Sequence, residues 1–260
     1  MELTKLHTYI KNPTNYIVDI GASTGIWYDP VYPFISNPKY KGLCIEGSSE
    51  KVIELRKNTT FDVCNQFIYP HNIIDIFRSY NVPTYLDVLK IDIDGFDLEV
   101  LRVVLSVYKP KIIIAEFNEK IPTPILFETK YQPNYSWDES HFYGFSIKSG
   151  EQVMNNFGYK ILSIVDGGNI LCVDSELRDI LGENKPNDVD FLYRTQYIET
   201  NSYSKLPWNA SINYWLNIKN PEILKNEIIY YFCNVNERSK LDKKTKVLDV
   251  DFSVDIASGY

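Results

Sequence analysis

The sequence has little of what several classes of protein require. No apolar run approaches the roughly 18 residues of a transmembrane helix, and the first residues lack the apolar core of a signal peptide. The four cysteines show no CxxC spacing and lie in apolar stretches, which indicates buried, reduced thiols. We therefore expect a cytoplasmic protein with no membrane partner.

Basic charge is also scarce. The formal net charge is −7, with 27 basic against 34 acidic residues, and no basic stripe that would follow a phosphate backbone. A long nucleic acid is therefore not expected as a partner. The 260 residues suffice for one catalytic domain with a sizeable core and added elements.

Short apolar stretches alternate with helical patterns along the first 182 residues. The expected strands are 16–20, 43–46, 67–69, 88–93, 111–116, 159–165 and 169–173. The expected helices between them are 49–57, 98–108 and 150–157. This alternation predicts parallel strands joined by crossover helices, and the glycine turn at 166–168 predicts a final hairpin.

Two segments depart from that rhythm. Residues 117–148 are rich in proline and aromatic residues, and we expect an ordered active-site loop there. Residues 183–260 begin with a polar linker at 183–188 and continue with helical patterns at 212–218 and 222–232. We therefore divide the chain into a domain at 1–182 and a helical extension at 183–260, which is either a lid or the surface of a homodimer.

The sharpest local pattern is a glycine turn after the first expected strand, with the sequence VDIGASTG at 18–25. Ligands of open parallel sheets bind at the carboxyl ends of the strands. Glycine permits a tight turn, and the helix that follows can direct its N–H groups at a ligand. The residues expected to form this cofactor-binding turn are Asp19, Gly21, Ala22, Ser23 and Gly25.

A second part of the same expected site follows the next strand. Glu46 and Gly47 end that strand, and a carboxylate there can accept hydrogen bonds from both ribose hydroxyls of a nucleotide. The adenine contact is expected in the loop after the third strand, at 70–73. His71 in that loop is either a cofactor contact or a capping or surface residue.

An acidic pattern, KIDIDGFD at 90–97, follows the fourth expected strand. Asp92 and Asp94 are candidate catalytic residues, because the ends of the fourth and fifth strands flank the centre of such a site, and Asp92 is also a candidate contact of the cofactor. Asp97 is expected instead to cap or charge the start of the next helix.

The fifth strand and the loop after it supply further candidates. Glu116 and His141 are candidate catalytic residues, and His141 would act as a general base beside a neighbouring carboxylate. Oxygen atoms of Asp92, Glu116 and Asn118 are ligands of the kind that Mg²⁺ prefers. The alternative is that Asp92 and Glu116 bind acceptor hydroxyls or nearby loops directly.

Together the ordered motifs DIGASTG, IEGS, KIDIDGFD and AEFN resemble the FkbM-like family of class I S-adenosylmethionine-dependent methyltransferases, over residues 15–178. Three residues depart from the usual patterns: Ser23 replaces a glycine, and Asp94 and Asp97 replace glutamates. The resemblance implies a Rossmann-like αβα sandwich with a mostly parallel seven-stranded sheet that ends in an antiparallel hairpin. It also implies O-methylation of a small polyol acceptor, a sugar or a glycan, with S-adenosylmethionine as cofactor.

Two other functions remain open. RNA 2′-O-methyltransferases use a Lys-Asp-Lys-Glu tetrad. Asp92 fits its aspartate, but the chain has no convincing lysine pair, and Lys90 is expected to lie deeper. A binding module that has lost its chemistry is the other alternative. The intact turn with Asp19 and Glu46 argues against it. The sequence does not name the acceptor or the methylated position.

Overall fold

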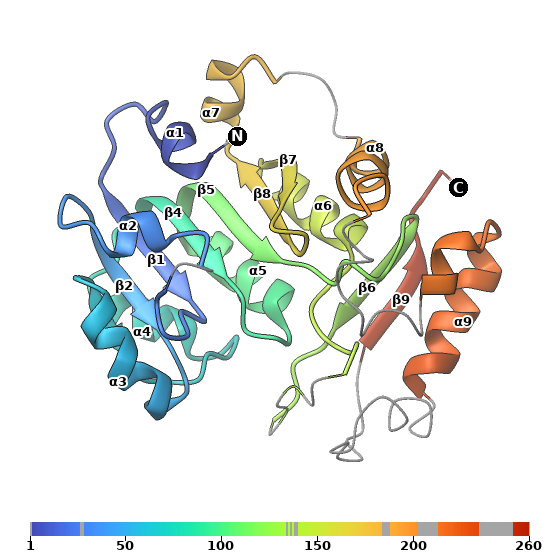
Figure 1. The fold of residues 1–260 in the computed structure, drawn as a ribbon, viewed down its shortest axis with the longest axis horizontal. Coiled ribbons are helices and arrows are strands. Elements are labelled where there is room, and N and C mark those ends of the chain that lie inside the picture. The colour runs from blue at the N-terminus through green and yellow to red at the C-terminus, as the bar shows by residue number, and fades with distance from the viewer. Residues whose placement is uncertain are drawn as a thin grey trace.

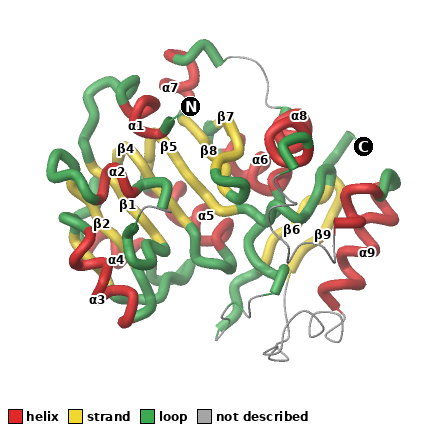
Figure 2. Tube along the Cα trace, viewed as in Figure 1, coloured by secondary structure: helices red, strands yellow, loops and turns green. Residues whose placement is uncertain are grey.

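The computed structural model describes residues 2–26, 29–133, 135, 137, 140–183, 188–201, 213–233 and 252–259. Most of the linker expected at 183–188 and the first residue of the helix expected at 212–218 lie outside these residues. The described elements form two sheets with helices packed around them (Figures 1 and 2). Within the described residues, no helix is both long and apolar enough to cross a membrane.

The larger sheet has seven strands in the order β3-β2-β1-β4-β5-β8-β7. Its strands are β1 (Tyr16–Ile20), β2 (Lys41–Ile45), β3 (Asp62–Cys64), β4 (Tyr85–Ile91), β5 (Lys109–Glu116), β7 (Lys160–Val165) and β8 (Asn169–Val173). Strands β1 to β5 pair in parallel, and β8 is antiparallel to both β5 and β7. The predicted Rossmann-like fold with its terminal hairpin is therefore confirmed.

Helices cover both faces of this sheet (Figure 1). They are α1 (Leu3–His7), α2 (Tyr32–Ile35), α3 (Ser49–Asn58), α4 (Ile73–Ser79), α5 (Asp97–Val107), α6 (Ile147–Asn156), α7 (Ser175–Ile180) and α8 (Val189–Tyr193), which continues into the π-helical turn η1 (Arg194–Ile198). Successive strand residues point to opposite faces, so Val18 packs with α4, α5 and α6 while Ile17 packs with α1, α2 and α7. This is why the central strands are buried on both faces and consist mainly of apolar residues, with Asp19, Asp87 and Lys90 as buried charged exceptions.

The structure corrects the position of the third strand. The stretch at 67–69 was expected to be that strand, but β3 is Asp62–Cys64, which pairs with β2. Phe67 lies beyond it and is 65% exposed. Its aromatic character favoured a strand locally, but the partner strand lies beside Val63.

The segment 117–148 contains a strand that its proline-rich sequence did not predict. Strand β6 (Ile125–Thr129) pairs antiparallel with β9 (Phe252–Ile256), near the end of the chain. Helix α9 (Pro221–Cys233) and the 3-10 turn η4 (Asn213–Asn217) pack with this pair, and Phe127 and Phe232 stack at its centre. The extension at 183–260 therefore packs on the segment 117–148 through the described part of its residues.

Candidate active site

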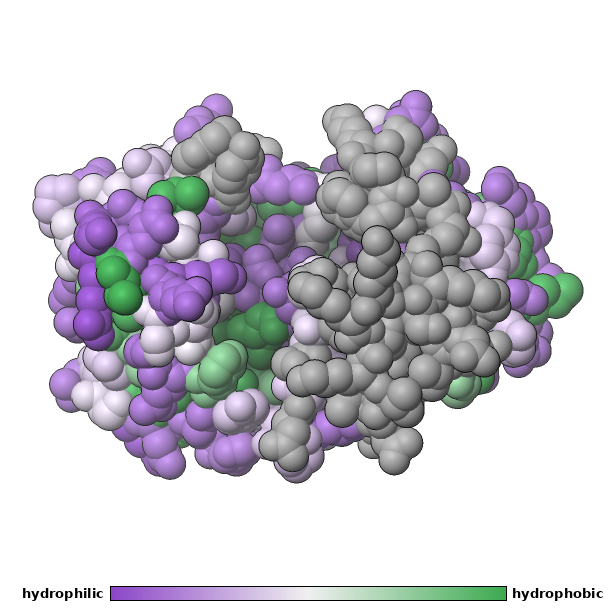
Figure 3. Space-filling model, turned by 60° about the horizontal axis from the view of Figure 1, so that its bottom comes forward, coloured by the Kyte–Doolittle hydropathy of each residue, from purple (hydrophilic) through white to green (hydrophobic). Residues whose placement is uncertain are grey.

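A cavity of about 490 Å³, here called the strand-end cavity, lies at the carboxyl ends of β1, β2 and β4. That volume is in the range of small-molecule sites. On the side of the molecule turned forward in Figure 3, a small group of hydrophobic residues near the middle lies next to hydrophilic residues. The predicted residues that line the cavity are Gly21, Ser23, Glu46, Gly47, Asp92 and Asp94.

The glycine turn brings the ends of β1 and β4 into contact. Gly21 has a φ of 79°, and a Cβ atom there would lie 1.7 Å from the carbonyl oxygen of Asp92. Only glycine fits such a close approach. Gly25 packs against Leu55 of α3 behind the turn, and neither Gly25 nor the buried Ala22 lines the cavity.

Glu46 is held by the backbone of two turns. Its Oε2 accepts from the N–H of Ser23 at 2.9 Å, and its Oε1 accepts from the N–H of Ser48 at 2.7 Å. A carboxylate oxygen has two lone pairs, so each oxygen can accept one further hydrogen bond. Glu46 is only 9% exposed but lines the cavity, where ribose hydroxyls could donate to it.

Aromatic side chains form one wall of the cavity; two of them, Tyr135 and Trp137, come from the expected active-site loop at 117–148, and the others were not predicted. Phe67, Tyr69, Phe96, Tyr135 and Trp137 all line the cavity. His71 does not. Its exposed ring stacks on Tyr69 with centroids 5.3 Å apart. Phe67 and Tyr69 were the available signal, but the stretch 67–69 also fits the pattern of a strand.

Lys90 is a buried cation beneath the glycine turn. Its Nζ lies 3.1 Å from the carbonyl oxygen of Gly21 and 3.2, 3.4 and 3.5 Å from carboxylate oxygens of Asp29, Asp19 and Asp92. Burial lowers the pKa of Lys90, but Asp19, Asp92 and Asp29 outweigh it and raise that pKa well above its ordinary value. Asp19 is fully buried and does not line the cavity. Its carboxylate pairs with the ammonium group of Lys90 inside the protein.

Three carboxylates meet where β4 and β5 end. Asp92, Asp94 and Glu116 each offer an oxygen, and these oxygens lie within 4.8 Å of one another. Burial and the charge of Asp92 raise the pKa of Asp94 to about 6. Burial, together with the charges of Asp92 and Asp94, raises the pKa of Glu116 well above its ordinary value. The cluster can attract a cation or accept hydrogen bonds from hydroxyl groups.

Asn118 and His141 do not line the strand-end cavity. The Nδ2 of Asn118 donates to the carbonyl oxygens of His141 and Tyr143 at 2.8 and 3.0 Å, so this side chain ties two backbone segments together. His141 is 5% exposed, its ring lies 6.2 Å from that of Tyr231, and it does not line the cavity. The carboxylates expected beside it, at 138 and 139, lie outside the described residues.

Asp97 shapes the loop that carries Asp94. It is the first residue of α5, and its carboxylate accepts from the N–H groups of Ile93 and Gly95 at 2.8 and 3.0 Å. Burial, the largest influence, raises its pKa to about 7. Asp97 therefore holds the loop before the helix, and Asp94 keeps its left-handed φ of 53° within that loop.

Comparison with known proteins gives structural matches alone. No family model and no curated protein matches the chain. A putative S-adenosylmethionine-dependent methyltransferase from Listeria monocytogenes matches with 13% identity and a TM-score of 0.42, over 67% of this chain and 96% of that one. The amino pentose methyltransferase CalS10 from Micromonospora echinaspora matches with 8% identity and a TM-score of 0.41, over 66% and 88%. A putative O-methyltransferase from Klebsiella pneumoniae matches with 14% identity and a TM-score of 0.40, over 66% and 77%.

Proposed function

We propose that this chain is an S-adenosylmethionine-dependent methyltransferase that methylates a hydroxyl group of a small polyol, a sugar or a glycan. The observation that carries the proposal is the strand-end cavity. The glycine turn, Glu46, Asp92 and Asp94 all line this one cavity. This lining supports a site that holds a nucleotide next to acidic side chains.

The residues present fit the cofactor. Glu46 keeps free acceptor positions for the two ribose hydroxyls, and the wall with Phe67 and Tyr69 offers an apolar surface to a flat base. When bound, S-adenosylmethionine supplies a methyl group on a positively charged sulfur. Asp92 and Asp94 line the same cavity, and their negative charge favours a positively charged group such as this sulfur beside them.

The acidic cluster suits the acceptor side of the reaction. A hydroxyl group must lose its proton as it is methylated, and a base works best when its pKa lies near the working pH. Asp94, with a pKa raised to about 6, is the candidate base, and Glu116 would position the acceptor. A magnesium ion held by Asp92, Asp94 and Glu116 is the alternative means of activating the hydroxyl.

The buried position of Lys90 weighs against the RNA 2′-O-methyltransferase alternative. Its ammonium group is surrounded by Asp19, Asp29 and Asp92, and the residue is 2% exposed. It therefore cannot approach an acceptor hydroxyl without leaving three carboxylates unpaired. We further propose that the extension at 183–260 borders the acceptor side of the site, as a lid or as the surface of a homodimer.

Calorimetric titration tests the proposal. We expect micromolar binding of S-adenosylmethionine and of S-adenosylhomocysteine, and no binding of NAD at the same concentrations. Each titration is repeated with Mg²⁺, which changes the affinity only if the acidic cluster holds the ion. Failure of both S-adenosyl ligands to bind, with and without Mg²⁺, would favour the non-enzymatic module.

A further inference from the structure

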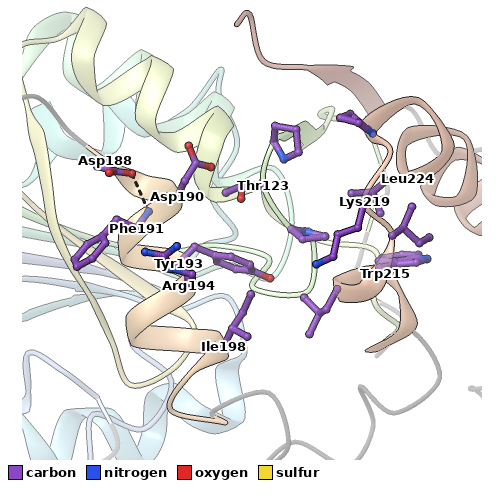
Figure 4. Close-up of a pocket in the computed structure, with 15 residues that line it drawn as sticks. Thr123, Asp188, Asp190, Phe191, Tyr193, Arg194, Ile198, Trp215, Lys219 and Leu224 are labelled. Atoms are coloured by element: carbon purple, nitrogen blue, oxygen red, sulfur yellow. Dashed lines mark hydrogen bonds between the residues drawn. The ribbon is translucent and has the colours of Figure 1, made fainter. Parts of the chain in front are cut away.

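A second cavity, of about 520 Å³, lies between the α8–η1 segment and the residues that lead into α9 (Figure 4). We call it the distal cavity. Tyr193 and Arg194 line it from one side, Trp215 and Lys219 line it from the other, and residues 122–124 close it. Tyr193 and Lys219 extend toward each other across it (Figure 4). Its size is within the range of small-molecule sites.

Two residues that line this cavity, Trp215 and Lys219, carry polar N–H groups for which the described residues supply no partner. Trp215 is fully buried, and its Nε1 has no hydrogen-bond partner within the described part of the chain. Leaving such a buried donor unpaired is unfavourable. Lys219 makes no ion pair with any residue that the structure describes, whereas Arg194 lies 3.7 Å from Glu199. The cavity therefore offers the ammonium group of Lys219 to a ligand, while the indole N–H is buried in its wall.

Acidic and apolar groups complete the lining. Asp188 accepts from the N–H of Phe191 at 2.8 Å, and Asp190 lies 3.3 Å from Lys148. Other lining residues are apolar: Pro122, Pro124, Leu216, Ile218, Pro221 and Leu224. A free anion would meet the two aspartates, a free cation would meet Arg194 and Lys219, and an apolar ligand would cover the Lys219 ammonium group without pairing it. A neutral ligand with hydroxyl groups and apolar C–H faces satisfies all three kinds of lining.

A short segment connects this cavity to the acidic cluster. The hydroxyl of Tyr193 donates to the carbonyl oxygen of Glu119 at 2.7 Å, and the Glu119 carboxylate accepts from the hydroxyl of Tyr143 at 2.8 Å. Glu116 of the cluster is three residues before Glu119, and the wall at 122–124 begins three residues after it. The same segment thus borders the acidic cluster at one end and the distal cavity at the other.

We propose that the distal cavity is a saccharide subsite that holds a second sugar unit of the acceptor. This inference rests on the proposed function, because the first unit would lie at Asp92, Asp94 and Glu116. It predicts that the acceptor is at least a disaccharide, with the methylated unit and its neighbour bound on either side of Glu119.

The indole N–H signals of the four tryptophans provide a separate readout for each cavity. In a two-dimensional ¹H–¹⁵N spectrum, the signals of Trp137 and Trp215 are assigned with Trp137→Phe and Trp215→Phe. S-Adenosylhomocysteine should shift the Trp137 signal, because Trp137 lines the strand-end cavity. Maltose, cellobiose and lactose are then titrated onto the saturated protein, and at least one of them should shift the Trp215 signal.

Matched lysine variants test the contact. Lys219→Met should weaken the disaccharide titration at least fivefold, while Lys57→Met on exposed α3 should leave it unchanged. A Trp215 signal that no disaccharide moves, in protein whose Trp137 signal responds to S-adenosylhomocysteine, overturns the saccharide subsite alone. A Trp215 signal that responds to inorganic phosphate or glucuronate but to no neutral disaccharide also overturns it. A Trp137 signal that ignores S-adenosylhomocysteine contradicts the proposed function itself.

Discussion

The two cavities are nearly equal in volume, at about 490 and 520 Å³, but they are built differently. The strand-end cavity is formed mainly by turns that directly follow β1, β2 and β4, and backbone groups hold its key side chains. The distal cavity is formed by side chains from three segments that are far apart in the sequence. The comparison teaches that a parallel sheet concentrates its loops at one edge, so a site there leaves continuous motifs in the sequence.

The two cavities also differ in how their charges are paired. Beneath the strand-end cavity, Lys90 contacts three carboxylates in a buried network. In the distal cavity, Lys219 has no ionic partner among the described residues, and the Trp215 donor is unpaired. We expect the first cavity to depend on an internal network and the second to depend on its ligand. The following predictions test that difference.

Lys90→Met should have the largest effect. Removing the cation leaves Asp19, Asp29 and Asp92 facing one another without compensation, and breaking a buried pair costs about 3–5 kcal/mol. The free energy of unfolding, measured with urea, should fall by that amount, and S-adenosylhomocysteine binding should be lost. Lys41→Met, at the exposed start of β2, is the control. A loss below about 1 kcal/mol would show that the network is not essential.

Glu46→Gln should weaken S-adenosylhomocysteine binding about 10- to 100-fold, which corresponds to about 1.4–2.8 kcal/mol. The amide group places an N–H₂ donor where the carboxylate accepts from Ser23 or Ser48, and it loses an acceptor for ribose. Calorimetry measures the change, with exposed Glu50→Gln as the control. Equal affinities for the two variants would remove Glu46 from the cofactor site.

The raised pKa of Asp97, about 7, predicts how stability depends on pH. The folded state binds this proton more tightly than the unfolded state, so the contribution is complete below about pH 4 and is lost as the pH rises to 7. The largest slope is about 1.4 kcal/mol per pH unit for one group. Urea unfolding between pH 5 and 8 should show a shallower decline for Asp97→Asn than for the wild type. Exposed Asp75→Asn should keep the wild-type slope, and an unchanged slope in Asp97→Asn would contradict the assignment.

Ser23→Gly should have the smallest effect. Ser23 has a φ of 48°, a left-handed conformation that costs a non-glycine residue about 1–2 kcal/mol. Glycine removes that strain but loses more entropy on folding, by roughly 0.5–1 kcal/mol. We expect a gain of at most about 1 kcal/mol by thermal unfolding, with cofactor affinity unchanged because Glu46 uses only the backbone N–H. Weaker binding would give the hydroxyl group a role of its own.

Much of the fold was predictable from the sequence because buried parallel strands are continuous apolar runs. The strands at 16–20 and 169–173 match the structure at both ends. β6 and its pairing with β9 escaped prediction, because this pairing joins residues more than 120 positions apart. The third strand was misplaced because two aromatic residues and an isoleucine at 67–69 favour a strand locally, while pairing with β2 decides the outcome.

The sequence by itself determined the alternation of strands and helices, the terminal hairpin, the glycine turn, and the acids at the ends of three of the strands. These features depend on neighbouring residues and on the edge of the sheet where strands end. Only the tertiary structure decided that Lys90 pairs beneath the turn, that His71 and His141 lie outside the cavity lining, and that Asp94 lies with Asp92 and Glu116 in the acidic cluster. Such contacts depend on how distant segments pack, and a local pattern carries no record of that packing.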